Sequence, residues 1–398
     1  MLTLEDPLRM LLNLPQQEKI ERGLEYTPRE ICQQPATWSR TYDRCGEQRD
    51  AVNALLHQAG IGRGPTASPA VYLVGAGTSD YVGRALAPLL RQRWGCDVWP
   101  VPSTTLLTDF EDFHPAGREY LWISFSRSGD SPEGVALLQR ALDQYPGIRH
   151  VVITCNRQGQ MAQICSGHEG RAVAVILDDA VNDRGLAMTS SFTNMILAGQ
   201  CVAHLGDYDE FGPTVAGLAE AGNRFLPVAA EAAAGITTLG CTRACFVGSG
   251  ALRAVADESA LKVVELSAGY VTSVAESPLG LRHGPLSSVD GQTLFVAFLS
   301  SDARRRGYEL DLLREIDRKR LGRVRAVVTA QAIDDVSPLA DYCLSLDADF
   351  SDSYRPVLDV MLGQLIGLFA SMRSGLKPDQ PSPNGAIARV VSPITLYS

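Results

Sequence analysis

The chain has 398 residues, of which 45% are hydrophobic and 20% are charged, and its formal net charge is −9. This composition is typical of a soluble globular protein with two or three domains. The negative charge disfavours nucleic acid and anionic membranes as partners. It does not exclude a small anion, because the dipoles of helix N-termini can bind phosphate.

The nine cysteines are scattered along the chain, and Cys241 and Cys245 lack a second pair of ligands at the spacing of a zinc site. We therefore expect reduced thiols in a cytoplasmic protein and no metal site. The N-terminus does not resemble a secretory signal, because Glu5 and Asp6 precede any basic residue. The apolar stretch 357–372 is shorter than the ~20 residues that a membrane span needs, so it predicts a buried helix.

Residues 1–65 are expected to form a helical N-terminal segment. Within it, Thr27-Pro28-Arg29-Glu30 has the pattern of a capping box with proline at the first helical position. This pattern predicts a helix that starts at Thr27, with the threonine hydroxyl as its cap, and runs towards Trp38.

From residue 70 on, short apolar strands alternate with amphipathic helices, which predicts parallel sheets with helices on both faces. The first half supplies four strand-like stretches, and the second half repeats the same order of strand, turn and helix. The expected strands lie within 70–75, 120–126, 150–156, 171–177, 243–248, 293–298, 322–331 and 341–347.

The repetition predicts two copies of one α/β domain. We expect the first copy at 66–210 and the second at 211–375, with Gly206-Asp207 interrupting the pattern between them. The tail, 376–398, is rich in proline and polar residues, and we expect an extended arm that lies on the core or is partly flexible.

Gly75-Ala76-Gly77 follows a strand and opens a helix, as in a dinucleotide-binding loop. However, the G-x-G-x-x-G pattern is not completed, and many α/β turns need glycine only for their backbone geometry. We therefore expect no nicotinamide cofactor.

Three serines, Ser126, Ser128 and Ser131, crowd the turn after the 120–126 strand. Ser131 is followed by proline and glutamate, which predicts a helix N-cap whose free N–H groups and dipole favour an anion. Taken alone, the stretch fits a polar turn with one cap equally well. Ser79 favours a phosphate site, since it follows another strand of the same sheet, and the carboxyl ends of parallel strands lie together.

In the second half, Glu258, Lys262 and Glu265 share one helix face. By itself this pattern favours a solvated stripe with a weak ion pair, although a helix carboxylate can also act as a general base in a cleft. His283 precedes Gly284-Pro285 and is expected on a turn. It is either a surface histidine or an acid–base group, because its ordinary pKa lies near neutral pH.

Five segments together resemble one family: GAGTS, SFSRSGDSPE, NDRGLAMTSSFT, ESALKVVELSAG and SPLGLRHGP. In this order they are similar to the sugar isomerase (SIS) double-domain proteins, and within them to the AgaS type. The resemblance covers nearly the whole chain. It implies a flavodoxin-like three-layer αβα fold in each half, with parallel sheets and a pseudo-twofold repeat.

The resemblance also implies a site for an amino-sugar phosphate. Ser79, Ser126, Ser128 and Ser131, with the adjacent Thr78, would bind the 6-phosphate, and the segment containing Leu186, Met188 and Thr189 would line the sugar. Glu265 would move a proton between C1 and C2, with Lys262 one turn earlier. His283 would open the ring from a neighbouring subunit, so a homodimer or larger homo-oligomer with shared active sites is expected.

The reaction implied is the conversion of galactosamine 6-phosphate to tagatose 6-phosphate and ammonia, with no metal or redox cofactor. Alternatives that the sequence leaves open are a plain aldose–ketose isomerase, a glucosamine-6-phosphate deaminase and a sugar-phosphate sensor without catalysis. No residue in the sequence distinguishes the galacto from the gluco epimer.

Overall fold

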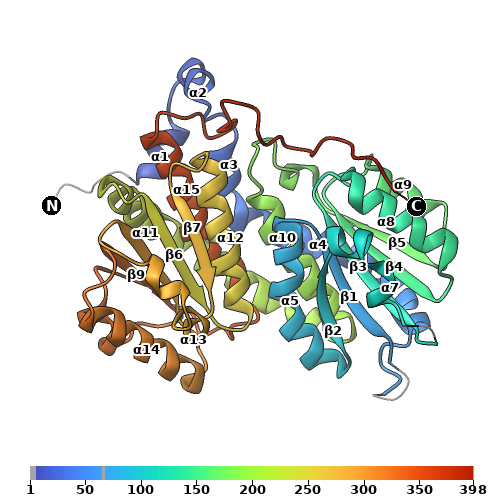
Figure 1. Cartoon of the computed structure of the whole chain (residues 1–398). Helices are drawn as coiled ribbons and strands as arrows, with labels where there is room; N and C mark the ends of the chain where they lie inside the picture. The colour runs from blue at the N-terminus through green and yellow to red at the C-terminus, as the bar shows by residue number, and fades with distance from the viewer. Residues whose placement is uncertain (1–5, 65–67, 116, 398) are drawn as a thin grey trace. The chain divides into compact units, whose positions relative to one another are not determined.

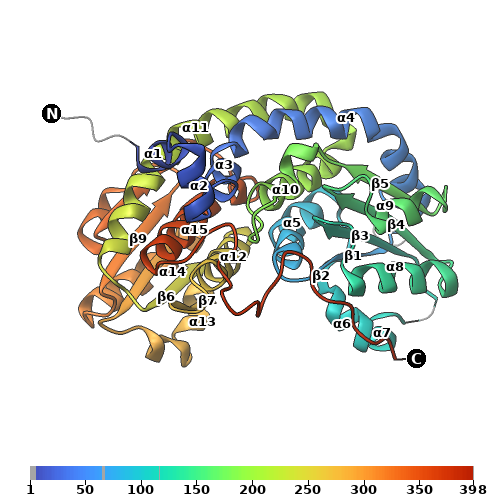
Figure 2. The same ribbon diagram turned by 90° about the horizontal axis from the view of Figure 1, so that it is seen from above.

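The structure of the chain is a computed structural model that describes residues 6–64, 68–115 and 117–397 (Figures 1 and 2). Its residues divide into two compact units, each built on one β-sheet. The first-sheet unit contains Ala36–Asn182, Ser190–Ala216 and the described residues from Ile387 on. The second-sheet unit contains the described residues up to Pro35, Asp183–Thr189 and Gly217–Ala386. Neither unit is contiguous in sequence, unlike the domain bounds expected from the repeat.

Five parallel strands form the first sheet in the order β2-β1-β3-β4-β5. Every residue of β1 and β3 is buried, because helices cover both faces of the sheet. This is the strand order of flavodoxin-like folds, in which ligands bind where β1 and β3 diverge at their carboxyl ends. The strand bounds are β1 Ala70–Gly75, β2 Val98–Pro102, β3 Tyr120–Ser126, β4 Ile148–Thr154 and β5 Ala172–Ile176.

Two helices, α5 and α10, pack together on one face of the first sheet, and α8 lies on the other (Figure 2). The side chain of Leu73 points to the α5 face, where it lies against Gly83. Tyr72 and Trp122 point to the opposite face, where they form a core with α6 to α8. The bounds are α5 Thr78–Trp94, α6 Ser103–Thr108, α7 Phe110–Phe113, α8 Pro132–Gln144, α9 Gln160–Ser166 and α10 Ser190–Ala203.

The second sheet has the order β10-β9-β8-β6-β7 and is also parallel. Counted along the chain this is the same topology as the first sheet, so the predicted repeat of one α/β fold is confirmed. Helices α12 and α15 pack on one face, and α13 and α14 cover the other. The bounds are β6 Arg243–Gly248, α12 Ala251–Leu266, β7 Thr272–Glu276, α13 Pro278–Leu281, β8 Thr293–Phe298, α14 Ala303–Arg318, β9 Val324–Thr329, β10 Tyr342–Ser345 and α15 Pro356–Arg373.

Helix α15 is the core helix that the apolar stretch predicts. It is also the single helix among the described residues that is long and apolar enough to cross a membrane, but 89% of it is buried within the protein. A buried core helix meets the same criterion, so the prediction of a core helix is confirmed.

The remaining helices precede or join the two sheets. Helix α11 continues without interruption through position 216, where the first-sheet unit gives way to the second-sheet unit. The expected break at Gly206-Asp207 is the short 3₁₀ helix η2 before it. The bounds are α1 Pro7–Leu12, α2 Gln16–Arg22, α3 Thr27–Cys32, α4 Gln34–Ala59, α11 Tyr208–Thr238, η1 Asp179–Val181, η2 Leu205–Asp207, η3 Pro285–Ser288 and η4 Asp334–Leu339.

The predicted capping box is wrong. Thr27 is the first helical residue of α3 rather than its cap, and the preceding residue, Tyr26, makes no side-chain cap. The Asp379 carboxylate, from far along the chain, caps the helix instead. It accepts the N–H groups of Glu25, Tyr26 and Thr27 at 2.7–3.0 Å. Helix α3 also ends at Cys32, so it does not reach the predicted end near Trp38.

Candidate functional site

The serine turn, residues 126–131, joins β3 to α8 in the first-sheet unit. Each of its three serine oxygens accepts a backbone N–H two or three residues later, at 3.0, 3.1 and 3.3 Å. The last of these bonds makes Ser131 the N-cap of α8, as predicted. Gly129 has a φ of +66°, a conformation that favours glycine. The local sequence therefore folds the turn so that its hydroxyls gather at the start of a helix.

A second loop holds the serine turn in place. Asn156 donates a side-chain hydrogen bond to the carbonyl of Ser128 at 2.8 Å, and Asp130 accepts the N–H of Gln160 at 2.9 Å. A side chain at Gly159 would lie 2.6 Å from the Ser128 carbonyl, so glycine is required for this close approach. These contacts pre-organise the turn without using its hydroxyls.

A cavity of about 60 Å³ lies at the divergence of β1 and β3. A cavity needs only ~10–15 Å³ of space open to the centre of a water molecule to hold one water, so the cavity at β1 and β3 has room for a small polar group. Three of the predicted phosphate ligands, Ser79, Ser126 and Ser131, line it together. Ser103 and Ser124 line it as well, and the sequence motifs did not single them out. The predicted ligands Thr78 and Ser128 lie in the adjoining turns, outside this set of lining residues.

The first turns of α5 and α8 both start at this edge of the sheet, and their dipoles favour an anion there. Of the nearby carboxylates, Asp80 pairs with Arg84 at 2.8 Å, whereas Glu133 accepts the hydroxyl of Ser131 at 3.2 Å. The Arg127 guanidinium, the positive charge closest in sequence, donates a hydrogen bond to the backbone carbonyl of Arg389 in the tail. The groups at this edge that could bind an anion are therefore hydroxyls and helix N-termini.

The segment predicted to line the sugar forms a tight loop, Asp183–Thr189, in the second-sheet unit. Asp183 closes it by accepting the backbone N–H of Thr189 at 2.7 Å. Leu186 and Met188 are half-buried, whereas Thr189 is fully buried and its carbonyl accepts a bond from Gln364 of α15 at 3.3 Å. The two half-buried side chains are thus the ones with surface left for a ligand.

Lys262 and Glu265, two of the residues predicted to be catalytic, form a chain of charges on α12 with Glu258. Lys262 Nζ lies 2.5 Å from Oε2 of Glu265 and 3.4 Å from Oε1 of Glu258. Glu258 and Lys262 are fully buried, while the Glu265 side chain is 23% exposed. The interpretation of these residues as a solvated stripe is therefore wrong, because α15 covers this face of the helix.

Burial by itself lowers the pKa of Lys262. The charges of Glu258 and Glu265 outweigh burial and hold that pKa above its ordinary value. Lys262 is thus a fixed ammonium that orients one carboxylate, Glu265, at the edge of the buried network. Removing the ammonium would leave buried charge uncompensated, at a cost of about 3–5 kcal/mol.

Among the described residues, no three His, Cys, Asp or Glu side chains are grouped so that they could hold a metal ion. The chemistry available at these positions is hydrogen bonding to an anion and proton transfer by a carboxylate.

No protein-family model matches the sequence. An AgaS protein of Streptomyces coelicolor is 38% identical over 381 residues, 95% of this chain and 97% of that one. The D-galactosamine-6-phosphate deaminase AgaS of Escherichia coli is 34% identical over 387 residues, 94% of this chain and 95% of that one. The chain belongs to the AgaS family.

A solved structure of a family relative agrees with this assignment. The tagatose-6-phosphate ketose/aldose isomerase of Escherichia coli superposes with a TM-score of 0.82 at 34% identity, covering 91% of this chain and 95% of that one. The recognition of an AgaS-type SIS protein from its sequence motifs is therefore confirmed.

In this AgaS family member, His283 lies on the turn after α13 and is exposed. Its backbone N–H bonds to the carbonyl of Gly280 at 3.0 Å, and Gly284 after it has a φ of +123°. No hydrogen bond or ion pair joins His283 to Glu265 among the residues that the structure describes. The structure thus places the histidine on the surface and does not bring it into contact with the predicted carboxylate.

The residues that hold the loop Asp183–Thr189, called the sugar loop after its predicted role, were not predicted from the sequence. Glu30 of α3 is buried and accepts the N–H groups of Arg184 and Gly185, at 2.6 Å and 3.4 Å for Oε1. The backbone carbonyl of Asp379 accepts the N–H of Leu186 at 3.0 Å. No local motif signals these residues, because their partners lie far away in the chain.

Proposed function

We propose that this chain is a phosphosugar enzyme that converts D-galactosamine 6-phosphate to tagatose 6-phosphate and ammonia. The observation that carries the proposal is the 34% identity to the D-galactosamine-6-phosphate deaminase AgaS of Escherichia coli over 94% of this chain. The buried serines at the divergence of β1 and β3 supply the kind of anion site that such a substrate needs.

In this proposal the 6-phosphate binds at the serine turn. Ser79, Ser126 and Ser131 donate hydroxyl hydrogen bonds, and Thr78 and Ser128 contribute from the adjoining turns. The N-termini of α5 and α8 add their dipoles, so that a net-acidic protein needs no basic side chain there. Leu186, Met188 and Thr189 line the sugar.

Chemistry begins when His283 transfers the protons that open the sugar ring. Glu265 then removes the C2 proton from the open-chain aldose and delivers a proton to C1, so that the amino group becomes an imine on C2. Water adds to the imine carbon, ammonia leaves, and the ketose 6-phosphate remains. Lys262 holds the Glu265 carboxylate in position throughout.

The exposed position of His283 is compatible with a histidine that serves the site of a second subunit. We therefore include a homo-oligomer with shared active sites in the proposal. Thiols without a disulfide, such as those of Cys165, Cys241 and Cys343, favour a reducing compartment such as the cytoplasm.

The experiment is to incubate the purified chain with galactosamine 6-phosphate and to measure ammonia and ketose phosphate together. We expect both products in equal amounts. Glu265→Gln should lower the rate by about 10²–10⁴-fold, the contribution of a general base, while inorganic phosphate still binds. Glu231→Gln, which changes an exposed glutamate of α11, should leave the rate unchanged. No ammonia release from galactosamine 6-phosphate or glucosamine 6-phosphate would refute the deaminase.

The second candidate is a plain aldose–ketose isomerase, favoured by the name of the 34%-identical tagatose-6-phosphate ketose/aldose isomerase. It would use the same carboxylate and the same phosphate site, but its substrate would carry a hydroxyl at C2. Comparing turnover of galactosamine 6-phosphate with turnover of tagatose 6-phosphate separates the two.

A further inference from the structure

The second sheet has its own divergence point, where β6 and β8 separate at their carboxyl ends. Gly248-Ser249-Gly250 follows β6, and the turn from Leu299 to Asp302 follows β8. By topology this is the counterpart of the serine-lined cavity in the first sheet, and ligands of open α/β sheets bind at such points. None of the residues named in the proposed function lies in these two turns.

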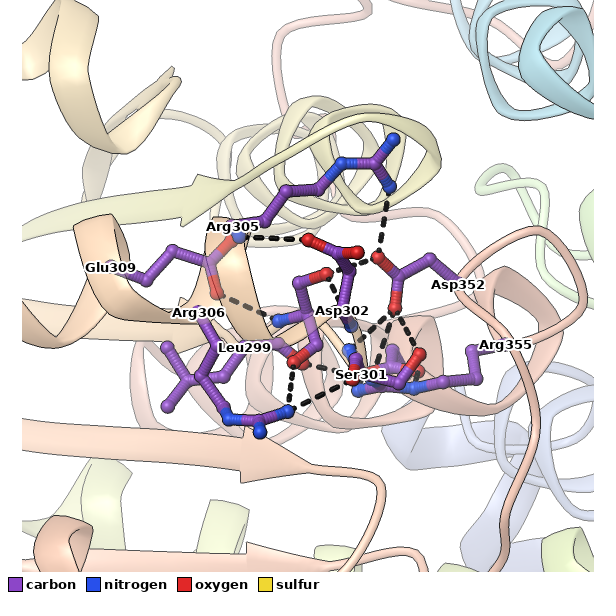
Figure 3. A network of polar contacts seen from close by, with 10 residues as sticks. Leu299, Ser301, Asp302, Arg305, Arg306, Glu309, Asp352 and Arg355 are labelled. Atoms are coloured by element: carbon purple, nitrogen blue, oxygen red, sulfur yellow. Dashed lines mark hydrogen bonds and ion pairs between the residues drawn. The ribbon is translucent and has the colours of Figure 1, made fainter.

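A carboxylate of the chain itself fills this point (Figure 3). Asp352, from the loop between β10 and α15, is buried. Its Oδ1 accepts both the backbone N–H and the hydroxyl of Ser301, at 2.7 and 2.8 Å. Its Oδ2 accepts the hydroxyl of Ser300. One carboxylate therefore collects three short hydrogen bonds from a single turn.

Two guanidinium groups complete the surroundings of Asp352. Arg305 of α14 lies 3.3 Å from Oδ2 of Asp352. Its Nη1 would lie 3.4 Å from a side chain at Gly250, so Arg305 spans the turn after β6 and the turn after β8. Arg355, which is fully buried, lies 3.5 Å from Oδ1 and pairs with Asp359 at 2.7 Å. Backbone N–H, hydroxyls and guanidinium groups are the donors that proteins use for phosphate.

The neighbouring space is occupied as well. Glu309 of α14 is buried and accepts the N–H of Ser300 at 2.7 Å. Burial raises the pKa of the Glu309 carboxyl above its ordinary value. The backbone N–H of Ser300 thus bonds to Glu309, whereas the two serine hydroxyls and the N–H of Ser301 bond to Asp352.

We propose that this second divergence point is an anion-binding site whose ligand is the chain's own Asp352 carboxylate, and that removing this carboxylate opens the site to inorganic phosphate. The turn after β8 carries the donors of an anion site, and Asp352 occupies the position that an external oxyanion would take.

This assignment separates the two units in function. The serine turn of the first unit has room for an external ligand, whereas the turn of the second unit is closed by an internal one. Asp352 contributes to stability in the same way as a bound anion, and its loss leaves the N–H of Ser301 and the hydroxyls of Ser300 and Ser301 short of an acceptor. An unsatisfied buried donor is costly, so an anion that restores the bonds should restore the stability.

The test uses Asp352→Ala in a Ser126→Ala/Ser128→Ala background, which weakens phosphate binding at the first unit. The midpoint of thermal unfolding is measured against inorganic phosphate, with sodium chloride at matched ionic strength. We expect Asp352→Ala to lower the midpoint and phosphate, but not chloride, to recover at least half of the loss. Adding Arg305→Met should abolish that recovery, because it removes a donor to the anion.

Two variants serve as controls. Asp349→Ala changes an exposed carboxylate of the same loop and should neither lower the midpoint nor create a phosphate response. Asp352→Asn keeps the turn filled by a neutral group of the same size, so it should lower the midpoint without gaining a response to phosphate.

The proposal is overturned if Asp352→Ala unfolds at the midpoint of its background, or if phosphate stabilises Asp352→Ala no more than Asp349→Ala. Should Asp352→Ala not fold in chloride, the recovery of folded protein on refolding in phosphate becomes the measurement. Recovery in phosphate supports the site, and failure in both salts refutes it.

Discussion

Glu30 is a buried carboxyl group that organises the sugar loop from a distance. Its oxygens accept two backbone N–H groups of the loop, those of Arg184 and Gly185. Burial, followed by the charges of Asp183 and Asp379, raises the pKa of Glu30 from 4.5 to about 8. Near neutral pH it is therefore mostly protonated, and the three neighbouring carboxyls carry less mutual repulsion than three anions would.

This raised pKa predicts a pH-dependent stability. Between pH 4.5 and about 8 the native chain binds a proton at Glu30 that the unfolded chain releases. Stability from this group is therefore complete below pH 4.5 and is lost as the pH rises towards 8, by at most about 1.4 kcal/mol per pH unit. Glu30→Gln keeps an acceptor for the loop and should flatten this part of the stability profile.

The measurement is the free energy of unfolding in denaturant at a series of pH values from 5 to about 8, a range set by the two pKa values. Glu21→Gln, which alters an exposed carboxylate of the same N-terminal segment, should keep the slope of the parent chain. A Glu30→Gln profile parallel to that of the parent chain would show that Glu30 does not hold this proton.

At the scale of elements, α15 is the support on which the sugar loop and the charged face of α12 are both built. Gln364 bonds to the carbonyl of Thr189 on one side. On the other, Gly367 allows α12 to approach closely, since a side chain there would lie 2.9 Å from the carbonyl of Lys262 and 2.8 Å from Leu266. The position of the Lys262 ammonium thus depends on a glycine in a different helix.

Gly367→Ala should push α12 away and destabilise the chain by about 1–3 kcal/mol, as overpacking of a core does. Since Lys262 would move with the helix, we also expect kcat to fall, in addition to any change in KM. Gly307→Ala is the matched control, because nothing lies within 4 Å of its new side chain on α14. That variant should be more stable by about 0.4–1 kcal/mol. Equal effects of the two substitutions would contradict this packing.

The elements that sequence predicts best are those whose signal is local and continuous. The apolar runs of β1, β3, β6 and β8 are buried throughout or nearly so, and all four were predicted. Strands β2 and β7 were missed because neither has a continuous apolar run: β2 contains two prolines, and β7, with the sequence TSVAE, begins and ends with polar residues. Their pairing with the neighbouring strand, rather than an apolar pattern, determines their structure.

The helix caps show the same difference between local signals and contacts across the chain. The N-cap at Ser131 was predicted because cap and helix are adjacent in sequence. The cap of α3 was assigned to the wrong residue because the true partner of Thr27, Asp379, is 352 residues away. Local chemistry can be inferred from a motif, whereas a contact across the chain requires the fold.

The C-terminal tail has two anchors, one in each unit. Asp379 fixes it to the second-sheet unit by accepting the N–H groups before α3. In the first-sheet unit, Arg127 of the serine turn donates to the carbonyl of Arg389, and Arg389 donates to the side chain of Asn182 at 2.6 Å. Arg127, which carries the positive charge of the serine turn, thus bonds to the tail, while its neighbour Ser126 lines the cavity.

Arg127→Met should therefore release the end of the tail and speed cleavage by trypsin after Arg389. A protease needs the segment to detach, and the variant removes one of the bonds that hold it. Mass spectrometry of the truncated product gives the rate. Arg118→Met, which alters an exposed arginine paired with Asp97, should cleave as the parent chain does. Unchanged cleavage in Arg127→Met would mean that the bond from Arg127 does not anchor this part of the tail.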